Sequence, residues 1–280
     1  MAFNELFDET LDINSTANYK LSIQVSLDGF YFSVLDTLRN KYVLFRSYEP
    51  DNDEKLTPEE IESYFRKDDF LNRSYAARNI MVAAPKSTVV PAQLYDPAGR
   101  DDYFLLTNQK EAGEEIIVNR LKYPDAYLIF SLGTHLRDLL SDMFPDSEFT
   151  HHLKPLLYTL NTGRQAHAEH LLHLHVERDF MNVIHMSGES VKLCNTFEHK
   201  NTSDLMYYLL YVARKSGIPA ATPLSVSGAT VRFDEIWSGL SDYIGNIRYA
   251  KPAGSVLFSY VFGEELLHRH LNLFSLASCV

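Results

Sequence analysis

The sequence predicts an α/β protein made of two copies of one unit, which is a duplicated fold with two lobes. Two stretches, 21–49 and 172–198, each have the pattern of three short strands joined by tight turns. A capped helix follows each stretch, and one more apolar strand follows each helix. Because a strand that returns through a helix runs parallel to its partner, each lobe should contain a mixed sheet flanked by helices.

The first strands of the two copies align when Asp28 is set against Asp179. Every second residue is then apolar in both strands: Leu21, Ile23 and Val25 in the first copy, and Leu172, Leu174 and Val176 in the second. This period of two is typical of strands with one buried face. Second strands at 30–35 and 181–186 follow in the same order. The alternative is that two unrelated meanders share this simple pattern.

A polar residue that can cap a helix opens the helix of each copy. Thr57-Pro58-Glu59-Glu60 has the pattern of a capping box with Pro at the first helical position. Thr202-Ser203-Asp204 predicts a looser cap with an early acidic residue. Apolar residues spaced three and four apart then predict one buried helix face: Leu205, Tyr208, Leu209 and Val212. Strands at 79–84 and 224–227 close the two units.

The two copies predict where the lobes begin and end. The first lobe spans 1–168, with its core at 20–84 and an insertion at 86–168. The second lobe spans 169–280. The insertion has no counterpart in the second copy, and Pro85 ends the strand that precedes it.

The insertion should contain two strands and three helices. The strands lie at 115–121 and 126–132, and short helices are expected at 101–108 and 152–160. Another helix should end before Pro145, with one apolar face made of Leu132, Leu136, Leu139, Leu140 and Met143.

The remaining segments give weaker patterns. Residues 1–19 are expected to form a lead-in arm before the first strand. Strands near 246–250 and 255–260 and a short helix at 264–268 should complete the second lobe.

Composition excludes several classes of protein. The formal net charge is −11 and no Lys or Arg cluster opposes it, so neither nucleic acid nor an anionic membrane is an expected partner. Cys194 and Cys279 are the only cysteines, which argues against a disulfide framework or a thiolate zinc site. No apolar run approaches the length of a membrane span, and no signal peptide is present, so we expect a cytoplasmic protein.

Three segments carry a resemblance to a known superfamily. They are Leu21–Val34 with its Leu27-Asp28-Gly29-Phe30 turn, the Tyr207–Val212 helix and the Leu224–Gly228 strand end. Together with the repeated order of elements, they make the chain similar to the actin-like ATPases, which have a ribonuclease H-like fold. In detail the chain resembles a bacterial family of uncharacterised proteins assigned to this fold, over nearly its whole length.

The resemblance implies a ligand cleft between the lobes. Active members hold the phosphates of ATP between two hairpin turns that read Asp-x-Gly. Here the first turn is Asp28-Gly29-Phe30 and the second is Asp179-Phe180-Met181, so one Gly is early and the other is missing. Active members also use a Gly-Gly pair at the adenosine, of which Gly228 in Ser227-Gly228-Ala229 is half. The resemblance therefore places Asp28, Gly29, Asp179 and Gly228 at the rim of the cleft.

Loss of these glycines predicts loss of catalysis, because bulky side chains keep a phosphate away from the backbone. We therefore expect no catalytic residues and no cofactor, and a binding or assembly module that forms a homodimer or engages a protein partner. The alternative is a working ATP-dependent enzyme, either an ATPase or a phosphotransferase, that uses the same cleft.

Histidines suggest a second kind of site. His173 and His175 share one strand face and His185 lies on the next strand, so a three-imidazole metal site with nearby His170 is one hypothesis. The other is an ordinary sheet face that is exposed to solvent or covered by a helix. Elsewhere, the sequence predicts solvated side chains for the pair at 151–152, and a surface helix for the two histidines at 268 and 270.

Overall fold

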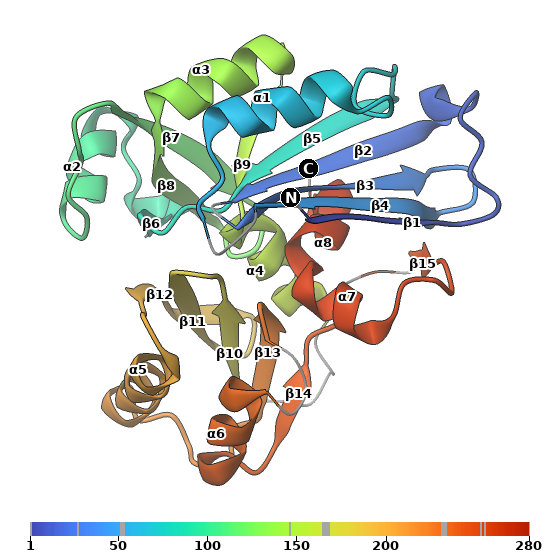
Figure 1. Ribbon diagram of the computed structural model, residues 1–280. Coiled ribbons are helices and arrows are strands. Elements are labelled where there is room, and N and C mark those ends of the chain that lie inside the picture. The colour runs from blue at the N-terminus through green and yellow to red at the C-terminus, as the bar shows by residue number, and fades with distance from the viewer. Residues whose placement is uncertain are drawn as a thin grey trace. The chain divides into compact units, whose positions relative to one another are not determined.

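The computed structural model describes residues 2–26, 28–50, 54–145, 147–163, 169–230, 234–252, 254 and 256–279. The chain forms two compact units (Figure 1). Unit 1 comprises residues 1–158, 253–263 and 272–280, and unit 2 comprises residues 159–252 and 264–271. Each unit is built around its own sheet.

Unit 1 contains a mixed sheet in the order β1-β4-β3-β2-β5-β9, with β15 paired to β4. The antiparallel strands are β1 (Ala2–Phe7), β2 (Tyr19–Ser26), β3 (Gly29–Asp36) and β4 (Lys41–Glu49). Three parallel pairs complete the sheet: β5 (Ala77–Val82) with β2, β9 (Phe149–His151) with β5, and β15 (Leu257–Phe258) with β4. A 3₁₀ turn, Thr16–Asn18, leads into β2. The expected lead-in arm thus forms an edge strand, β1.

Helices cover both faces of this sheet (Figure 1). On one face, α1 (Pro58–Lys67) and α3 (Thr134–Met143) pack side by side over a core that includes Ile61 and Leu140. On the opposite face lies α8 (Leu271–Cys279), whose Phe274 ring meets Tyr42 at 5.1 Å between centroids. The helix α4 (Leu153–Thr162) follows β9.

The predicted insertion forms a small antiparallel sheet in the order β6-β8-β7. Its strands are β6 (Ser87–Pro91), β7 (Glu114–Leu121) and β8 (Ala126–Gly133). The helix α2 (Arg100–Leu105) follows two 3₁₀ turns, Ala92–Leu94 and Pro97–Gly99. Phe104 of α2 is fully buried against the sheet, so the insertion has its own small core.

Unit 2 contains a mixed sheet in the order β12-β11-β10-β13-β14. Its strands are β10 (His170–Val176), β11 (Phe180–Ser187), β12 (Ser190–Glu198), β13 (Leu224–Gly228) and β14 (Ile247–Tyr249). The helices α5 (Thr202–Lys215) and α6 (Glu235–Tyr243) pack on one face through residues such as Leu209 and Leu240. A short helix, α7 (Glu264–Arg269), completes the unit.

The two sheets repeat one pattern, as the sequence predicts. In unit 1 the strand β2 pairs antiparallel with β3 and parallel with β5, and in unit 2 the strand β10 pairs antiparallel with β11 and parallel with β13. The order β4-β3-β2-β5-β9 therefore corresponds to β12-β11-β10-β13-β14. Two mixed sheets flanked by helices confirm the predicted fold class. The lobe boundaries at 168 and 169 stay a prediction.

Several local predictions need correction. Leu132 belongs to β8 and not to the apolar face of the following helix, which begins at Thr134. Asn201, rather than Thr202, caps α5, since its side chain accepts a hydrogen bond from the Asp204 amide at 2.9 Å. The helix α8 and the strands β6 and β9 have no counterpart among the predicted elements. Leu27 of the predicted turn lies outside the described residues.

In the described part of the chain, every helix is too short or too polar to cross a lipid bilayer.

Candidate functional site

The turn between β2 and β3 is closed by a side chain of its own strand. The Tyr31 hydroxyl donates a hydrogen bond to the Asp28 carbonyl at 3.3 Å. A Cβ added to Gly29 would lie 2.4 Å from this hydroxyl oxygen, so Gly29 makes room for the phenol. Tyr31 is 3% exposed. The glycine of the predicted Asp-Gly turn therefore leaves the space that the end of the Tyr31 side chain occupies.

The equivalent turn in unit 2, between β10 and β11, is also closed from within. Nε2 of His199 donates to the Glu177 carbonyl at 3.1 Å, and the His199 amide donates to the Asp179 carbonyl at 3.1 Å. The Asp179 side chain remains 40% exposed and lies 4.0 Å from Nε of Arg178. The turn thus presents a carboxylate, while two of its carbonyls are bound by one histidine.

Gly228 ends β13 where that strand meets the end of β10. Its φ is +90°, and an added Cβ would lie 2.0 Å from the Val176 carbonyl oxygen. The next amide, Ala229, donates to that oxygen at 2.7 Å. Only glycine fits such an approach of two backbones. This contact brings Gly228 close to the turn that carries Asp179.

The four predicted rim residues are therefore distributed two to a unit. Asp28 and Gly29 lie at one turn of unit 1, whereas Asp179 and Gly228 lie at neighbouring turns of unit 2. A common rim formed by all four stays a prediction.

The histidines of β10 form a buried hydrogen-bond chain. His173 Nε2 lies 3.0 Å from Ser227 Oγ, which lies 2.8 Å from His175 Nδ1. His175 Nε2 lies 3.0 Å from Glu177 Oε1. Because Ser227 is 0% exposed, its oxygen is inaccessible to a substrate despite the Ser-His-Glu order. We therefore assign this chain a structural role.

Burial shapes the protonation of this chain. It raises the pKa of the Glu177 carboxyl from 4.5 to about 8, although nearby Arg269 opposes the shift. Burial, with help from His175, also holds the pKa of His173 well below its usual range. With a protonated carboxyl the chain runs one way: Glu177 donates to His175, His175 to Ser227, and Ser227 to His173.

The register excludes the three-imidazole hypothesis. His185 pairs with Leu172 across β10 and β11, so it lies on the sheet face opposite His173 and His175. There its Nε2 lies 3.2 Å from Nδ1 of His170. In the described residues, no three His, Cys, Asp or Glu side chains come together as metal ligands.

The solvated pair at 151–152 was a wrong prediction, whereas the predicted surface helix exists as α7, with Glu264 and Arg269 exposed but its histidine buried. His151 and His152 are fully buried, and Nε2 of His151 lies 3.0 Å from the Ala84 carbonyl oxygen. His268 is 2% exposed and its Nε2 donates to the Thr230 carbonyl at 2.7 Å. His270 is 6% exposed. Packing, rather than polarity, decides the position of these side chains.

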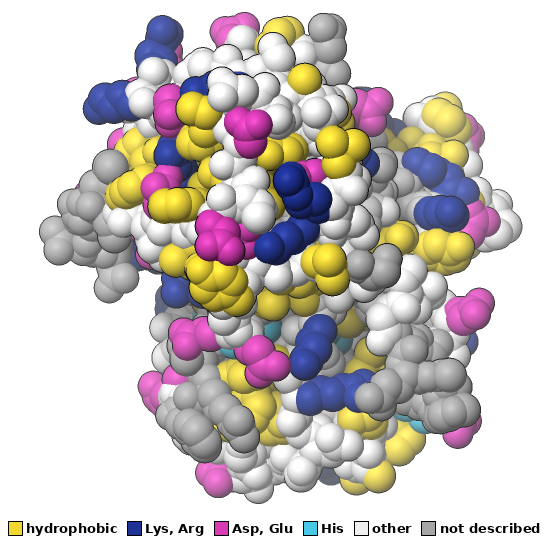
Figure 2. All heavy atoms as spheres, turned by 90° about the vertical axis from the view of Figure 1, so that its right-hand side faces the viewer, with side chains coloured by type: hydrophobic (Ala, Val, Ile, Leu, Met, Phe, Trp, Pro, Cys, Tyr) yellow, Lys and Arg dark blue, Asp and Glu magenta, His cyan; other side chains and the backbone are white. Residues whose placement is uncertain are grey.

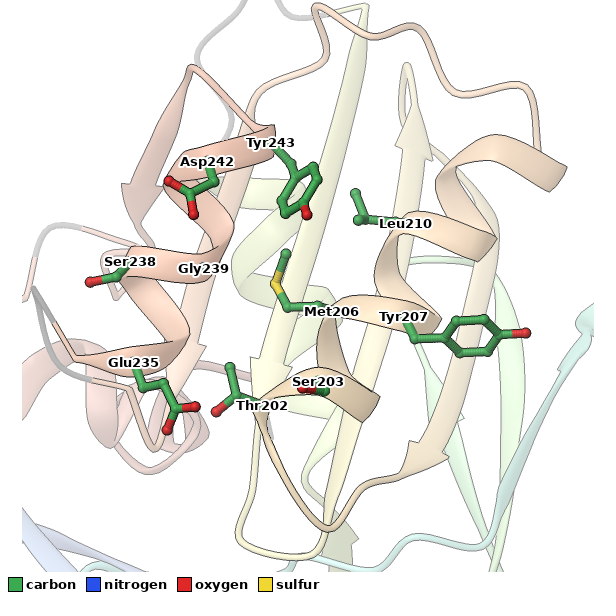
Figure 3. A pocket seen from close by; sticks show the side chains of 10 residues that line it. All are labelled: Thr202, Ser203, Met206, Tyr207, Leu210, Glu235, Ser238, Gly239, Asp242 and Tyr243. Carbon is green, nitrogen blue, oxygen red and sulfur yellow. The ribbon is translucent and has the colours of Figure 1, made fainter.

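Unit 2 has a groove between two helices that the sequence patterns did not reveal (Figure 3). This α5–α6 groove has a volume of about 610 Å³. The residues from α5 are Thr202, Ser203, Met206, Tyr207 and Leu210, and those from α6 are Glu235, Ser238, Gly239, Asp242 and Tyr243. A glycine inside a helix and exposed tyrosines near it are the signals that could have indicated it.

The α5–α6 groove combines apolar, aromatic and acidic groups. Met206 and Gly239 face each other at its floor, and Tyr243 points toward Leu210 (Figure 3). The described part of its lining includes the acids Glu235 and Asp242 but no Lys or Arg. A smaller pocket of about 320 Å³ in unit 1 is lined by Ser74, Tyr75, Arg78, Pro145 and Ser147.

On the face shown in Figure 2, charged side chains do not form a continuous area of one sign. Lys and Arg side chains occur there in small groups among acidic and apolar ones. Together with the net charge of −11, this arrangement offers no extended basic surface on that face for a phosphate backbone.

The match to a family model covers most of the chain. The model is described as "Protein of unknown function (DUF3822)" and matches residues 8–247. The chain belongs to the DUF3822 family. A comparison of this DUF3822 protein with curated proteins found no match.

Solved structures establish the fold of this DUF3822 protein. A Bacteroides thetaiotaomicron protein, described as having an actin-like ATPase fold and unknown function, is 24% identical with a TM-score of 0.79. The match covers 86% of this chain and 93% of that one. A chain from a PilM-PilN type IV pilus biogenesis complex is 12% identical with a TM-score of 0.63, covering 92% and 97%. The predicted actin-like ATPase fold is confirmed.

Proposed function

We propose that this protein is a binding or assembly module of actin-like fold that has lost ATP catalysis. The observation that carries the proposal is the closure of both hairpin turns by the protein's own side chains, Tyr31 in unit 1 and His199 in unit 2. In active proteins that the chain resembles, these turns hold the phosphates of ATP.

The closed turns are poorly suited to a phosphate. A triphosphate needs backbone N–H groups that it can approach closely, as glycine-containing turns provide. Here the phenol of Tyr31 occupies the space beside Gly29, and the second turn has Phe180 and Met181 in place of a glycine. As part of this proposal, Asp28 and Gly29 of unit 1 and Asp179 and Gly228 of unit 2 contact another ligand, with no catalytic residue and no cofactor.

A binding or assembly module of this kind would bind another protein or a second copy of the chain. A protein of the same fold has been solved in the PilM-PilN complex, so the fold can serve in an assembly with another protein. The acidic composition and the Bacteroides relative support a cytoplasmic protein of a bacterium as part of the proposal.

Isothermal titration calorimetry with Mg·ATP tests the proposal on the full chain. We expect no heat of binding with or without magnesium, because neither turn offers an open phosphate cradle. A micromolar, magnesium-dependent heat that disappears in Asp28→Asn and Asp179→Asn would contradict the proposal. That result would establish the alternative, an ATPase or phosphotransferase that uses these turns.

A further inference from the structure

The helix α6 carries two residues that do not favour a stable helix and one large aromatic side chain that is left exposed. Gly239 lies in its middle, where glycine is costly. Asp242 lies in its last turn, where the helix dipole disfavours an acid and no basic residue is present. Tyr243 leaves 69% of its surface exposed. Residues that disfavour the local structure and lie together on one surface indicate that the surface has a function.

Packing does not require the glycine. A Cβ on Gly239 would lie 3.7 Å from Sδ of Met206 and 3.9 Å from Cγ2 of Thr202, which are ordinary contacts. Alanine would therefore fit and would favour the helix. Glycine instead leaves the floor of the α5–α6 groove open above Met206, a flexible side chain that can adapt to an apolar group.

Two exposed tyrosines lie on α5 beside the groove. Tyr207 belongs to the lining, with its ring directed away from α6 (Figure 3), and Tyr211 follows one turn later. Tyr207 and Tyr211 are 62% and 47% exposed, and their rings lie 5.9 Å apart at an angle of 18°. Nζ of Lys215 lies 5.8 Å from the centroid of the Tyr211 ring. This tyrosine pair thus already accepts one cation, as aromatic faces do.

The acidic charge of the groove lining also favours a cationic group. Glu235 and Asp242 stand near opposite ends of α6, both exposed, and none of the described residues that line the groove is basic. The α5 side of the lining runs from Thr202 to Leu210, which at 1.5 Å per residue is about 12 Å. An extended segment of roughly four residues fits this length.

We propose that the α5–α6 groove binds a short segment of a partner protein in which an apolar side chain is flanked by Arg or Lys. The apolar side chain packs on Met206 where Gly239 carries no side chain of its own. The flanking cations pair with Glu235 and Asp242 or stack on the exposed tyrosines. This inference rests on the proposed binding function and names the chemistry of the partner.

Fluorescence anisotropy with defined peptides tests it on the full chain. The probe is a short labelled peptide of alternating Leu and Arg, compared with one that has Glu in place of Arg and one that has Gly in place of Leu. At physiological salt, where long-range attraction is screened, we expect the Leu/Arg peptide to bind at least about tenfold more tightly than either control.

Variants locate the binding. Asp242→Lys should lower the affinity for the Leu/Arg peptide by about tenfold or more. Gly239→Leu should have the same effect, because its side chain fills the floor of the groove. Both replacements suit the helix better than the native residues, so thermal unfolding should show folded proteins. Asp138→Lys, which changes an exposed acid of α3 in unit 1 by the same charge, should leave the affinity unchanged.

Three results would overturn the inference. The first is equal binding of the Leu/Arg peptide to the native protein and the Asp242→Lys variant. The second is an equal loss in Asp138→Lys, which would indicate attraction by net charge alone. The third is self-association in sedimentation that Asp242→Lys abolishes, which would make a second copy the occupant. Failure of the proposed function appears separately, as Mg·ATP heat in the calorimeter.

Discussion

At the scale of single residues, the buried hydrogen bonds from Glu177 to His173 show how much the alternation of residues along a strand can predict. The period of two correctly put His173 and His175 on the face opposite Leu174. It could not show what covers that face, and so could not exclude either metal or solvent. The side chains instead satisfy one another through Ser227, because buried polar groups need hydrogen-bond partners.

The raised pKa of Glu177 makes stability depend on pH. In the unfolded chain the carboxyl loses its proton near pH 4.5, whereas in the folded protein it keeps the proton up to about pH 8. Between these values the folded state binds more protons, so stability should fall as pH rises, by an amount on the order of a few kcal/mol. Glu177→Gln should remove this dependence, because its amide can donate to His175 as the protonated acid does.

Urea unfolding at several pH values between about 3.5 and 9, a range chosen to bracket both pKa values, measures this effect. Glu198→Gln, which alters an exposed acid on the adjacent sheet edge, serves as the control and should follow the native protein. If Glu177→Gln were less stable than the native protein at every pH, the carboxyl would be ionised and paired in the folded state.

The predicted rim residues show the same limit. The sequence identified turns at Asp28 and Asp179, and both turns exist where they were expected. That Tyr31 and His199 close them could not be predicted, because His199 lies a whole hairpin away in the chain. Gly228 looked like half of an adenosine turn, yet its close contact with the Val176 carbonyl explains it without any ligand.

At the scale of elements, amphipathic and capped segments could be predicted, and uniformly buried ones could not. The capping box of Thr57 forms as expected, with the Glu60 amide donating to the threonine oxygen at 3.3 Å. The helix α8 was missed because its polar residues are buried along with its apolar ones. Asn272 is 1% exposed and Ser275 is 0% exposed, so no period of 3.6 marks a face.

The corrected cap of α5 gives a prediction for that element. Asn201→Ala should destabilise the protein by about 1 kcal/mol, because the Asp204 amide loses its acceptor. Thr57→Ala should cost a similar amount at α1. Thr202→Ala, at the residue that the sequence pattern favoured, should change stability by less than about 0.5 kcal/mol. Urea unfolding of the three variants shows which residue caps α5. An equal loss of stability in the Thr202 and Asn201 variants would contradict the assignment of Asn201 as the cap.

At the scale of the whole molecule, the sequence does not show that C-terminal segments belong to unit 1. Repeats in the sequence can show that two sheets share one pattern, because the order of strands and helices in each copy is determined by residues close together in the sequence. They cannot show that residues 256–263 and 272–279 return to unit 1, because this depends on contacts more than 200 residues apart. The Tyr42 hydroxyl, for example, donates to the Phe274 carbonyl at 2.6 Å.

Phe274 should therefore stabilise a sheet that is formed by the opposite end of the sequence. Its ring lies 5.1 Å from Tyr42, 5.6 Å from Phe258 and 5.9 Å from Phe45, and it is 1% exposed. Phe274→Ala leaves a cavity among these rings and should cost roughly 3–5 kcal/mol. Because the loss lies beneath β4, hydrogen exchange of the β4 amides should accelerate most. Tyr260→Ala, at a residue that is 81% exposed, should leave both stability and exchange near native values. Unchanged exchange in β4 of the Phe274→Ala variant would show that the C-terminal helix contributes nothing to this sheet.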